Sequence, residues 1–416
     1  MIDKIGLNRP TTASFSEASV SFADLGISDA VLSILEKFKL TAPTPIQRKA
    51  IPTALSGHDL IGVAQTGTGK TYAFGIPILQ RIGSTNRQAL VIAPTRELAL
   101  QVGESLQKLG QALNFRVAIL IGGESFDRQL FCLRRDPQIV VVTPGRLIDH
   151  LQRRTFKLER VSILVLDEAD MMLDMGFAPQ IKEILDQAPL DRQTMLFSAT
   201  MPAAIVKIAA KYMKLPVSIE VAPSGTTVEQ VDQEIFIIKN EERLDYLQKI
   251  LATYTGSVLI FVRTKHGVKA LTQKLQSFGQ RATEIHSNLS LNRRRAALND
   301  FKTKRERILV ATDVAARGLD VDDIELVVNY NLPDSCEDYV HRIGRTGRAG
   351  RPGKAISLAT PAEQRMVYSI ERLINKSIKK TEFTKFYAEP APRHFGGSRR
   401  SSGGPRRYAR RQPFSR

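Results

Sequence analysis

Residues 59–71 read DLIGVAQTGTGKT, and this stretch predicts a buried strand, a glycine-rich turn and the start of a helix. Residues 64–71 match a phosphate-binding loop that has alanine in place of its first glycine. The glycines would let backbone N–H groups approach phosphate oxygens, Lys70 would neutralise phosphate charge, and the Thr71 hydroxyl would ligate Mg²⁺. The predicted contact residues are Ala64, Gln65, Thr66, Gly67, Thr68, Gly69, Lys70 and Thr71. A turn with a purely structural role is the alternative.

Apolar runs separated by helical stretches continue along the chain from this loop. Residues 163–166 (ILVL) are apolar at every position, which is typical of a parallel strand buried on both faces. We therefore predict doubly wound α/β sheets. The strands expected in the first sheet are 59–64, 89–93, 116–121, 138–143, 162–166 and 194–197, and those of a second, smaller sheet are 234–238, 257–262, 281–285, 307–311, 325–329 and 354–358.

Residues 222–227 (APSGTT) are polar, contain proline and glycine, and lack periodicity, so we expect the boundary between two domains there. The predicted organisation is a flexible amino-terminal extension (1–20), a first domain (21–221), a linker (222–229), a second domain (230–380) and a basic tail (381–416). From Arg393 onward the chain has eight arginines and no acidic residue, so we expect this tail to be disordered.

The formal net charge of +18 favours a polyanionic partner, because cations that neutralise phosphates release condensed counterions. Nucleic acid is the favoured partner, with an acidic membrane or protein surface as the alternative. Cys132 and Cys336 belong to no CxxC or Cys/His cluster, so neither a zinc site nor a disulfide framework is indicated. No apolar run has the length of a signal peptide or a membrane span, and we expect a soluble, cytoplasmic protein without membrane contact.

A second motif supplies carboxylates. The apolar strand at 163–166 continues directly into residues 167–170, which read DEAD. Asp167 would hold Mg²⁺, and Glu168 would act as a general base on the attacking water. An acidic first turn of a helix, stabilised by the helix dipole, is the alternative.

A third motif, HRIGRTGR at residues 341–348, combines arginine with glycine. Arg345 and Arg348 are candidates for arginine fingers, which stabilise the negative charge that develops on a transferring phosphoryl group. A solvated basic loop is the alternative.

In this order and spacing, the motifs between Phe22 and Arg348 resemble those of the DEAD-box family of superfamily 2 RNA helicases, and the chain is most similar to the bacterial RhlE group. The resemblance implies two tandem RecA-like domains with helices on both faces of each sheet. It also implies ATP and Mg²⁺ as cofactors and single-stranded or duplex RNA as the substrate. By the same resemblance, Phe22, Thr44, Gln47 and Asp320 would contact the nucleotide.

The resemblance further assigns residues to RNA and to the coupling of hydrolysis with unwinding. The expected RNA-binding residues are Pro94, Thr95, Arg96, Gly122, Gly123, Thr143, Pro144, Gly145, Arg146, Arg263 and Thr312. The expected coupling residues are Ser198, Thr200, Asp313, Arg317 and His341. Lys39 and Leu291 depart from the family pattern, which has glycine and glutamine there. We expect Lys39 to change only a helix end and Leu291 to alter an interdomain or RNA contact.

The predicted function is that of an ATP-dependent RNA helicase, which binds RNA through its backbone and unwinds duplexes locally. Two alternatives remain: an ATP-gated RNA clamp or chaperone without productive unwinding, and a DNA translocase of the same superfamily. The chain is expected to act as a monomer, with ribosomal or RNA-degradation assemblies as candidate partners.

Overall fold

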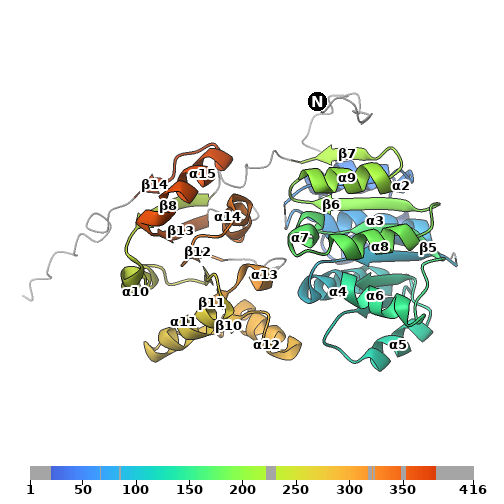
Figure 1. Cartoon of the computed structure of the whole chain (residues 1–416). Coiled ribbons are helices and arrows are strands. Elements are labelled where there is room, and N and C mark those ends of the chain that lie inside the picture. Colours follow the sequence, from blue (N-terminus) through green and yellow to red (C-terminus); the bar gives the residue numbers. More distant parts are fainter. Residues whose placement is uncertain are drawn as a thin grey trace, which may run out of the picture.

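The computed structural model describes residues 20–65, 67–83, 86–221, 231–316, 321, 324–347 and 353–380. These residues form two bodies, each built on a seven-stranded sheet with helices on both faces (Figure 1). The strand pairs recorded in both sheets are all parallel. The predicted α/β class is therefore confirmed. The expected tail, the expected linker and residues 1–19 lie outside the described part of the chain.

The first sheet has the strand order β3-β4-β2-β5-β6-β1-β7. Its strands are β1 (Leu60–Val63), β2 (Gln88–Ile92), β3 (Val117–Leu120), β4 (Ile139–Val142), β5 (Val161–Leu166), β6 (Gln193–Ser198) and β7 (Val217–Glu220). Its helices are η1 (Ala23–Leu25), α1 (Asp29–Lys37), α2 (Pro45–Leu55), α3 (Lys70–Ile82), α4 (Arg96–Gln111), α5 (Phe126–Arg134), α6 (Pro144–Gln152), α7 (Ala169–Asp174), α8 (Ala178–Gln187) and α9 (Ala203–Tyr212).

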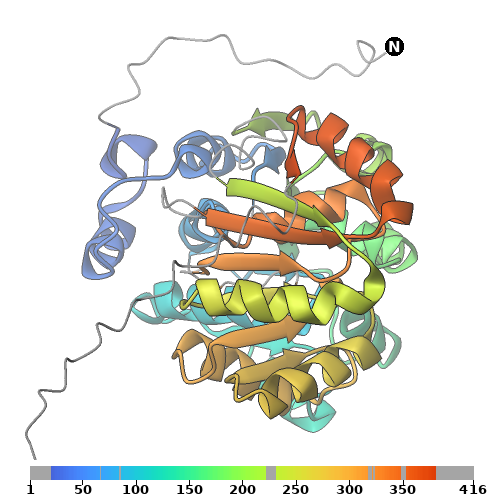
Figure 2. The same ribbon diagram turned by 90° about the vertical axis from the view of Figure 1, so that its left-hand side faces the viewer.

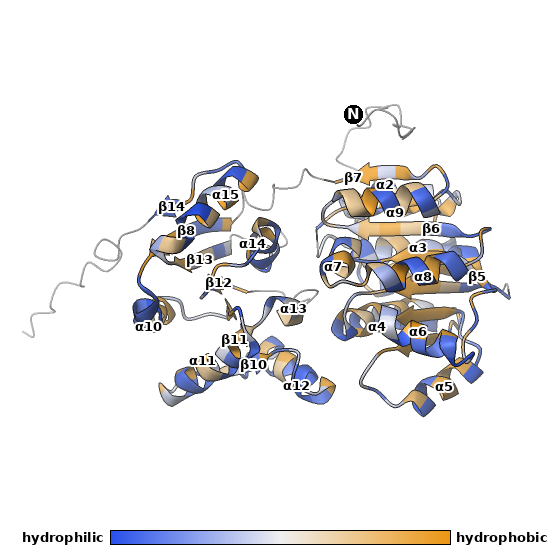
Figure 3. Cartoon of the chain, in the orientation of Figure 1, coloured by the Kyte–Doolittle hydropathy of each residue, from blue (hydrophilic) through white to orange (hydrophobic). Residues whose placement is uncertain are grey.

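Alternate residues of the central strands supply one core on each face of this sheet. Ala89 and Val91 of β2 belong to the core formed with α2, α3 and α4, whereas Leu90 and Ile92 belong to the core formed with α6, α8 and α9. Strands that are covered on both faces are apolar over most of their length, as residues 163–166 of β5 illustrate. Figure 3 shows the hydrophobic colour on strands such as β6 and more of the hydrophilic colour on outer helices such as α8.

The second sheet has the order β10-β11-β9-β12-β13-β8-β14. Its strands are β8 (Val231–Ile237), β9 (Val258–Phe261), β10 (Ala282–Ile285), β11 (Ile308–Ala311), β12 (Leu326–Asn329), β13 (Gly353–Ala359) and β14 (Lys379–Lys380). Its helices are η3 (Asn240–Glu242), α10 (Arg243–Thr253), α11 (Lys265–Ser277), α12 (Leu291–Lys302), α13 (Asp313–Ala316), α14 (Cys336–Ile343), η4 (Pro361–Glu363) and α15 (Gln364–Ile374). Figures 1 and 2 place α10 on the side of this body that is turned away from the first body.

Two edge strands escape prediction from the sequence. β7 is only partly buried, and β14 consists of two exposed lysines, so neither has a continuous apolar run. Because β14 completes a second sheet of seven strands, the expectation of a smaller second sheet is wrong. Among the helices of the described residues, none has the length and apolar character needed to cross a membrane.

Candidate active site

The loop expected to bind phosphate leaves β1 and ends where α3 begins at Lys70. Gly67 and Gly69 have φ angles of +85° and +92°, which glycine adopts without the steric cost that a side chain would add. A Cβ atom on Gly69 would also collide with the side-chain amide of Gln47. The backbone conformation therefore favours glycine at position 69, and a side chain there would also displace the Gln47 amide. Thr66, another expected contact, lies outside the described residues.

Lys70 is buried, and two groups hold its ammonium. Nζ donates to Glu168 Oε1 over 2.8 Å and to the carbonyl oxygen of Ala64 over 3.0 Å. Burial disfavours the cation, but the carboxylates of Glu168 and Asp167 outweigh this effect and raise the pKa of Lys70. Lys70 is therefore charged, and the expected phosphate ligand is paired directly with the expected general base.

Asp167 and Glu168 lie at the carboxyl end of β5, beside this loop. Glu168 has a φ angle of +52°, which is rare for a residue other than glycine and places its side chain at the start of α7. Asp167 is 3% exposed, and its Oδ1 has no hydrogen-bond partner among the described residues. Burial raises the pKa of Asp167 to about 7.

A buried carboxylate oxygen without a partner fits a hard cation. Mg²⁺ takes oxygen ligands and is usually held by one or two protein groups, substrate phosphates and waters. The unpaired Asp167 Oδ1 is suited to this role. The second expected ligand, Thr71, is half-buried in the first turn of α3, directly after Lys70.

The amino end of α2 contacts the loop at residues 64–71 from another side. Gln47 Oε1 accepts from the backbone N–H of Thr44 over 3.0 Å, and Gln47 Nε2 donates to the carbonyl oxygen of Gly69 over 3.0 Å. Thr44 Oγ1 is buried without a hydrogen-bond partner in the described part of the chain. Phe22, expected beside the base, is buried in the apolar core on the same face of the sheet as α2.

Asp170 ties the DEAD segment to residues 198–200. Its Oδ2 accepts from the backbone N–H of Thr200 at 2.8 Å, from the Thr200 hydroxyl at 2.9 Å and from the N–H of Ala199 at 3.1 Å. Its own N–H donates to Ser198 Oγ at 3.2 Å. The two expected coupling residues of this segment are thus bonded directly to the carboxylate motif, through a residue that was not among the predicted site residues.

The RNA-binding residues expected in the first body follow three neighbouring strands. They are Pro94, Thr95 and Arg96 after β2, Gly122 and Gly123 after β3, and Thr143, Pro144, Gly145 and Arg146 after β4. Because parallel strands end at the same edge of a sheet, these segments lie together. The Arg96 guanidinium covers the two glycines so closely that a Cβ on either would contact it. Arg146 Nε and Nη1 are buried without hydrogen-bond partners among the described residues.

In the second body, an arginine missed by sequence reasoning organises the expected coupling residue Asp313. Arg342 donates from Nε to Asp313 Oδ1 over 2.5 Å and from Nη2 to Asp313 Oδ2 over 2.7 Å. Its guanidinium also lies 5.0 Å from the centre of the Phe261 ring. Arg342 belongs to the HRIGRTGR motif, so the motif itself was the signal. A bidentate ion pair of this kind fixes α14 against α13.

The remaining expected residues of the second body are engaged within it. Arg263 pairs with Asp334 at 3.3 Å and with Glu363 at 3.2 Å. Arg345 is buried, and its Nε donates to the carbonyl oxygen of His341 over 3.3 Å. Thr312 is half-buried directly after β11. Arg317, Asp320 and Arg348 lie outside the described residues.

The two bodies meet through the first turns of α12. Arg294 Nη2 donates to Glu97 Oε2 of α4 over 2.5 Å, and Arg295 pairs with Glu124 at 3.2 Å. Leu291 is buried and belongs to the apolar cluster of the first body. Neither Glu97 nor Arg294 was among the predicted site residues, although Glu97 directly follows the expected RNA-binding Arg96.

Residues 44–208 match the DEAD/DEAH box helicase family, and residues 242–350 match the helicase conserved C-terminal domain. The DEAD-box ATP-dependent RNA helicase CshA of Geobacillus kaustophilus is 44% identical over 363 residues, which are 86% of this chain and 78% of the relative. CshA of Bacillus subtilis is 43% identical over 86% of this chain and 74% of the relative. This chain belongs to the DEAD-box ATP-dependent RNA helicases.

Solved structures of DEAD-box proteins share the architecture. S. cerevisiae Dbp5 bound to RNA and ADP BeF3 superposes with a TM-score of 0.79, at 32% identity, over 87% of this chain and 96% of that chain. Mss116p bound to ssRNA and AMP-PNP superposes with a TM-score of 0.81, at 28% identity, over 90% of this chain and 82% of that chain. The predicted pair of tandem RecA-like domains is confirmed. The relatives named here are CshA proteins, so the similarity to the RhlE group stays a prediction.

Proposed function

We propose that this DEAD-box helicase binds ATP and Mg²⁺ between loop 64–71 and Asp167, and couples hydrolysis to the local unwinding of RNA that it holds by the backbone. The buried Lys70–Glu168 pair beside the unpaired Asp167 oxygen carries the proposal. A phosphate-binding cation, a general base and a metal ligand then form one cluster at the carboxyl edge of the sheet, where α/β folds bind ligands.

The chemistry follows from the contacts of Lys70. When ATP binds, Lys70 would exchange Glu168 for phosphate oxygens. This exchange releases the Glu168 carboxylate, which would then accept a proton from the attacking water. Asp167 and Thr71 would hold Mg²⁺, which would supply positive charge to offset that of the phosphates.

The second body would complete the site when the two bodies close. Arg345 and Arg348 would supply positive charge to the transferring phosphoryl group. For this, Arg345 would leave its contact with the His341 carbonyl, while His341 and Asp320 would help to hold the nucleotide between the bodies. The Glu97–Arg294 pair joins α12 of the second body to the segment of the first body that would bind RNA. This contact supports the proposal that RNA promotes closure of the two bodies.

RNA would lie along the segments that follow β2, β3 and β4, and would be contacted from the second body by Arg263 and Thr312. These segments present backbone and arginine groups that are suited to binding phosphates. Contacts with phosphates position a nucleic acid without reading its sequence. Because ATP and RNA would each contact both bodies, binding of one ligand should strengthen binding of the other.

We further propose that the helicase acts as a monomer in the cytoplasm, where a bacterial protein of this family would meet its RNA. Ribosomal and RNA-degradation assemblies are the proposed settings, because both contain structured RNA that needs local unwinding. Gel filtration with light scattering would test the monomer, since a dimer mass would contradict it.

The decisive experiment measures steady-state ATP hydrolysis with and without single-stranded RNA, for the wild type and for Glu168→Gln. We expect RNA to stimulate hydrolysis, and the substitution to lower kcat at least about 10²-fold, because glutamine cannot accept the proton; ATP should still bind, because Lys70 remains. Hydrolysis independent of RNA would contradict the proposal.

Two additions to this experiment separate the alternative functions. DNA of the same sequence lacks the 2′-hydroxyl groups, so equal stimulation by DNA would favour a DNA translocase. A strand-displacement assay on an RNA duplex tests the clamp, because RNA-stimulated hydrolysis without displacement would favour ATP-gated binding alone.

A further inference from the structure

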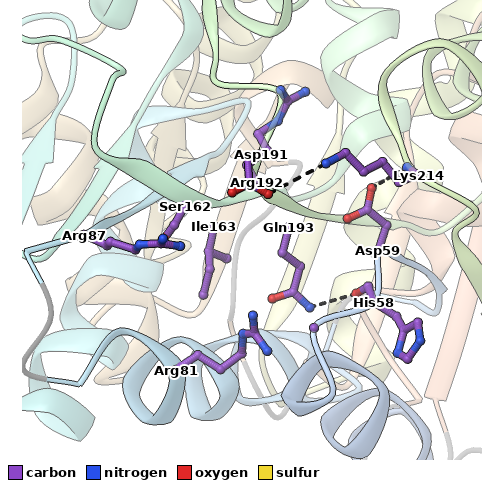
Figure 4. A pocket seen from close by; sticks show the side chains of 11 residues that line it. His58, Asp59, Arg81, Arg87, Ser162, Ile163, Asp191, Arg192, Gln193 and Lys214 are labelled. Atoms are coloured by element: carbon purple, nitrogen blue, oxygen red, sulfur yellow. Dashed lines mark hydrogen bonds and ion pairs between the residues drawn. The ribbon is translucent and has the colours of Figure 1, made fainter.

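A basic cavity lies at the opposite edge of the first sheet from the proposed nucleotide site. The cavity has a volume of about 350 Å³, and its lining includes Asp59, Arg81, Arg87, Gln193 and Lys214 (Figure 4). Asp59 directly precedes β1, Gln193 begins β6, and Lys214 precedes β7. The nucleotide residues follow the carboxyl ends of the same sheet. Strands of four to six residues separate the two edges by about 13–20 Å. The cavity is thus a separate place in the fold.

Two guanidinium groups in this cavity lack an acidic partner. Arg81, at the end of α3, donates from Nη1 to the Leu55 carbonyl oxygen at 2.9 Å, and no carboxylate of the described residues pairs with Arg81 or Arg87. Asp59 also lines the cavity but pairs with neither arginine; its two oxygens accept from the backbone N–H groups of Thr194 and Lys214, at 2.7 and 2.6 Å. Guanidinium groups bind carboxylates or phosphates well.

The cavity also contains an unsatisfied acceptor. Gln193 Nε2 donates to the carbonyl oxygens of Ala54 at 2.9 Å and His58 at 2.8 Å, which fixes the orientation of the amide. Gln193 Oε1 is buried and has no hydrogen-bond partner among the described residues. Leaving a buried acceptor unpaired is costly, so a donor on a bound ligand would be favoured here.

Two leucines at the rim are almost fully exposed. Leu190 is 85% exposed and Leu215 is 84% exposed, more than any other large apolar residue of the described chain. They lie beside the cavity because their sequence neighbours Asp191 and Lys214 line it and form an ion pair 4.0 Å apart. Leu215 also has a φ angle of +43°, which is uncommon for leucine. Exposed apolar side chains beside a basic cavity are suited to contact with a protein partner.

We propose that this surface docks an acidic segment of a partner protein that also carries aliphatic side chains. Carboxylates of the segment bind Arg81 and Arg87, a backbone N–H donates to Gln193 Oε1, and an aliphatic side chain covers Leu190 and Leu215. A peptide supplies all three groups. An RNA strand offers phosphates and 2′-hydroxyls but nothing aliphatic for the leucines.

The two ends of this chain do not match the cavity. The sequence from Arg393 onward carries eight arginines and no acid, so it would be repelled by the cavity. Residues 1–19 contain two acidic and two basic residues and have no net charge. A second copy of a chain with a net charge of +18 is likewise a poor acidic partner.

The test is a display selection of random 16-residue peptides on the immobilised full chain, followed by affinity measurements on the enriched peptides. Arg81→Gln/Arg87→Gln removes the two cations. Arg365→Gln/Arg372→Gln is the matched control, because both arginines are exposed on α15 of the second body. Leu190→Ser/Leu215→Ser removes the apolar rim without changing charge. Retained ATPase activity shows that each variant is folded.

We expect enriched peptides to combine Asp or Glu with Leu, Ile or Val. They should bind the wild type and the control equally, and bind each of the other two variants at least about tenfold more weakly, since charged hydrogen bonds and buried leucine contacts are lost. Failure to enrich acidic peptides, or equal binding by all variants, overturns the proposal. So does a loss of affinity for single-stranded RNA in the arginine variant with peptide binding unchanged, because the cavity would then hold RNA.

Discussion

Arg294 Nη2 of α12 lies 2.5 Å from Glu97 Oε2 of α4. Both residues are buried, although their helices belong to different bodies. Arg294 Nε and Glu97 Oε1 are buried and have no hydrogen-bond partner among the described residues. Burial lowers the pKa of Arg294 despite the nearby carboxylate. Leu291, one turn earlier, packs in the apolar cluster of the first body. The departure from glutamine at position 291 therefore produces an apolar contact between the bodies.

A double-mutant cycle should measure what the Glu97–Arg294 pair contributes to closure. Glu97→Gln and Arg294→Gln should each weaken the effect of RNA on the KM for ATP, because one substitution leaves the other charge buried and unpaired. We expect a coupling energy of about 1–3 kcal/mol. The control cycle uses Glu124 and Arg295, whose side chains are 34% and 45% exposed, and should give at most about 1 kcal/mol. Equal coupling in both cycles would mean that closure does not depend on the buried pair.

Gly69→Ala should weaken nucleotide binding, and a second glycine with the same backbone conformation serves as its control. Gly69 and Gly176 both have positive φ angles, but a Cβ would strike Gln47 only at Gly69, and nothing lies within 4 Å of one at Gly176. Either alanine should cost about 1–2 kcal/mol of stability for its left-handed backbone. Only Gly69→Ala should weaken ATP binding, at least about tenfold. Calorimetric titration with ATP measures this, and a comparable loss in Gly176→Ala would show that backbone strain alone is responsible.

Thr200→Val should separate hydrolysis from unwinding. The substitution keeps the shape of the side chain and removes the hydroxyl that donates to Asp170 at 2.9 Å, while the two backbone donors remain. We expect RNA-stimulated ATPase to change by less than about threefold and strand displacement to fall at least about tenfold, because a hydrogen bond to a charged group contributes about 1.5–3 kcal/mol. Thr253→Val, which loses only an exposed bond within α10, is the control. A parallel fall of both activities would contradict the coupling role.

Acid should destabilise the first body through His150. This histidine is fully buried, and burial lowers its pKa to about 4. Between about pH 4 and 6.5, the unfolded chain binds a proton that the folded chain does not, so stability falls as the pH drops through this window. The loss should reach about 2 kcal/mol near pH 5 relative to neutral pH. Urea unfolding of the wild type and His150→Gln at both pH values tests this.

The control for the histidine prediction is His58→Gln, which replaces an exposed histidine of the same body. This variant should keep the acid sensitivity of the wild type, whereas His150→Gln should lose most of it. An unchanged pH dependence in His150→Gln would assign the acid sensitivity to other groups.

Several features of the site could be predicted because they depend on short stretches of chain. The loop at 64–71 and the carboxylates at 167–170 each follow an apolar strand, and a parallel sheet brings such strand ends to one edge. β7 and β14 could not be predicted, because edge strands that are partly exposed lack the apolar pattern of central strands. The burial of Phe22 and the contact of Arg345 with His341 also depend on neighbours that are distant in sequence or on local packing.

The sequence by itself determined the α/β class, the order of the motifs and the residue types available for phosphate, metal and RNA, since periodicity and glycine placement are local properties. Only the tertiary structure decided which charges meet. Lys70 and Glu168 are 98 residues apart, and Arg294 and Glu97 are 197 apart. Their pairing depends on strand order and on the packing of α12 against the first body. Those arrangements are set by crossover connections and buried apolar contacts, which no short stretch of sequence contains.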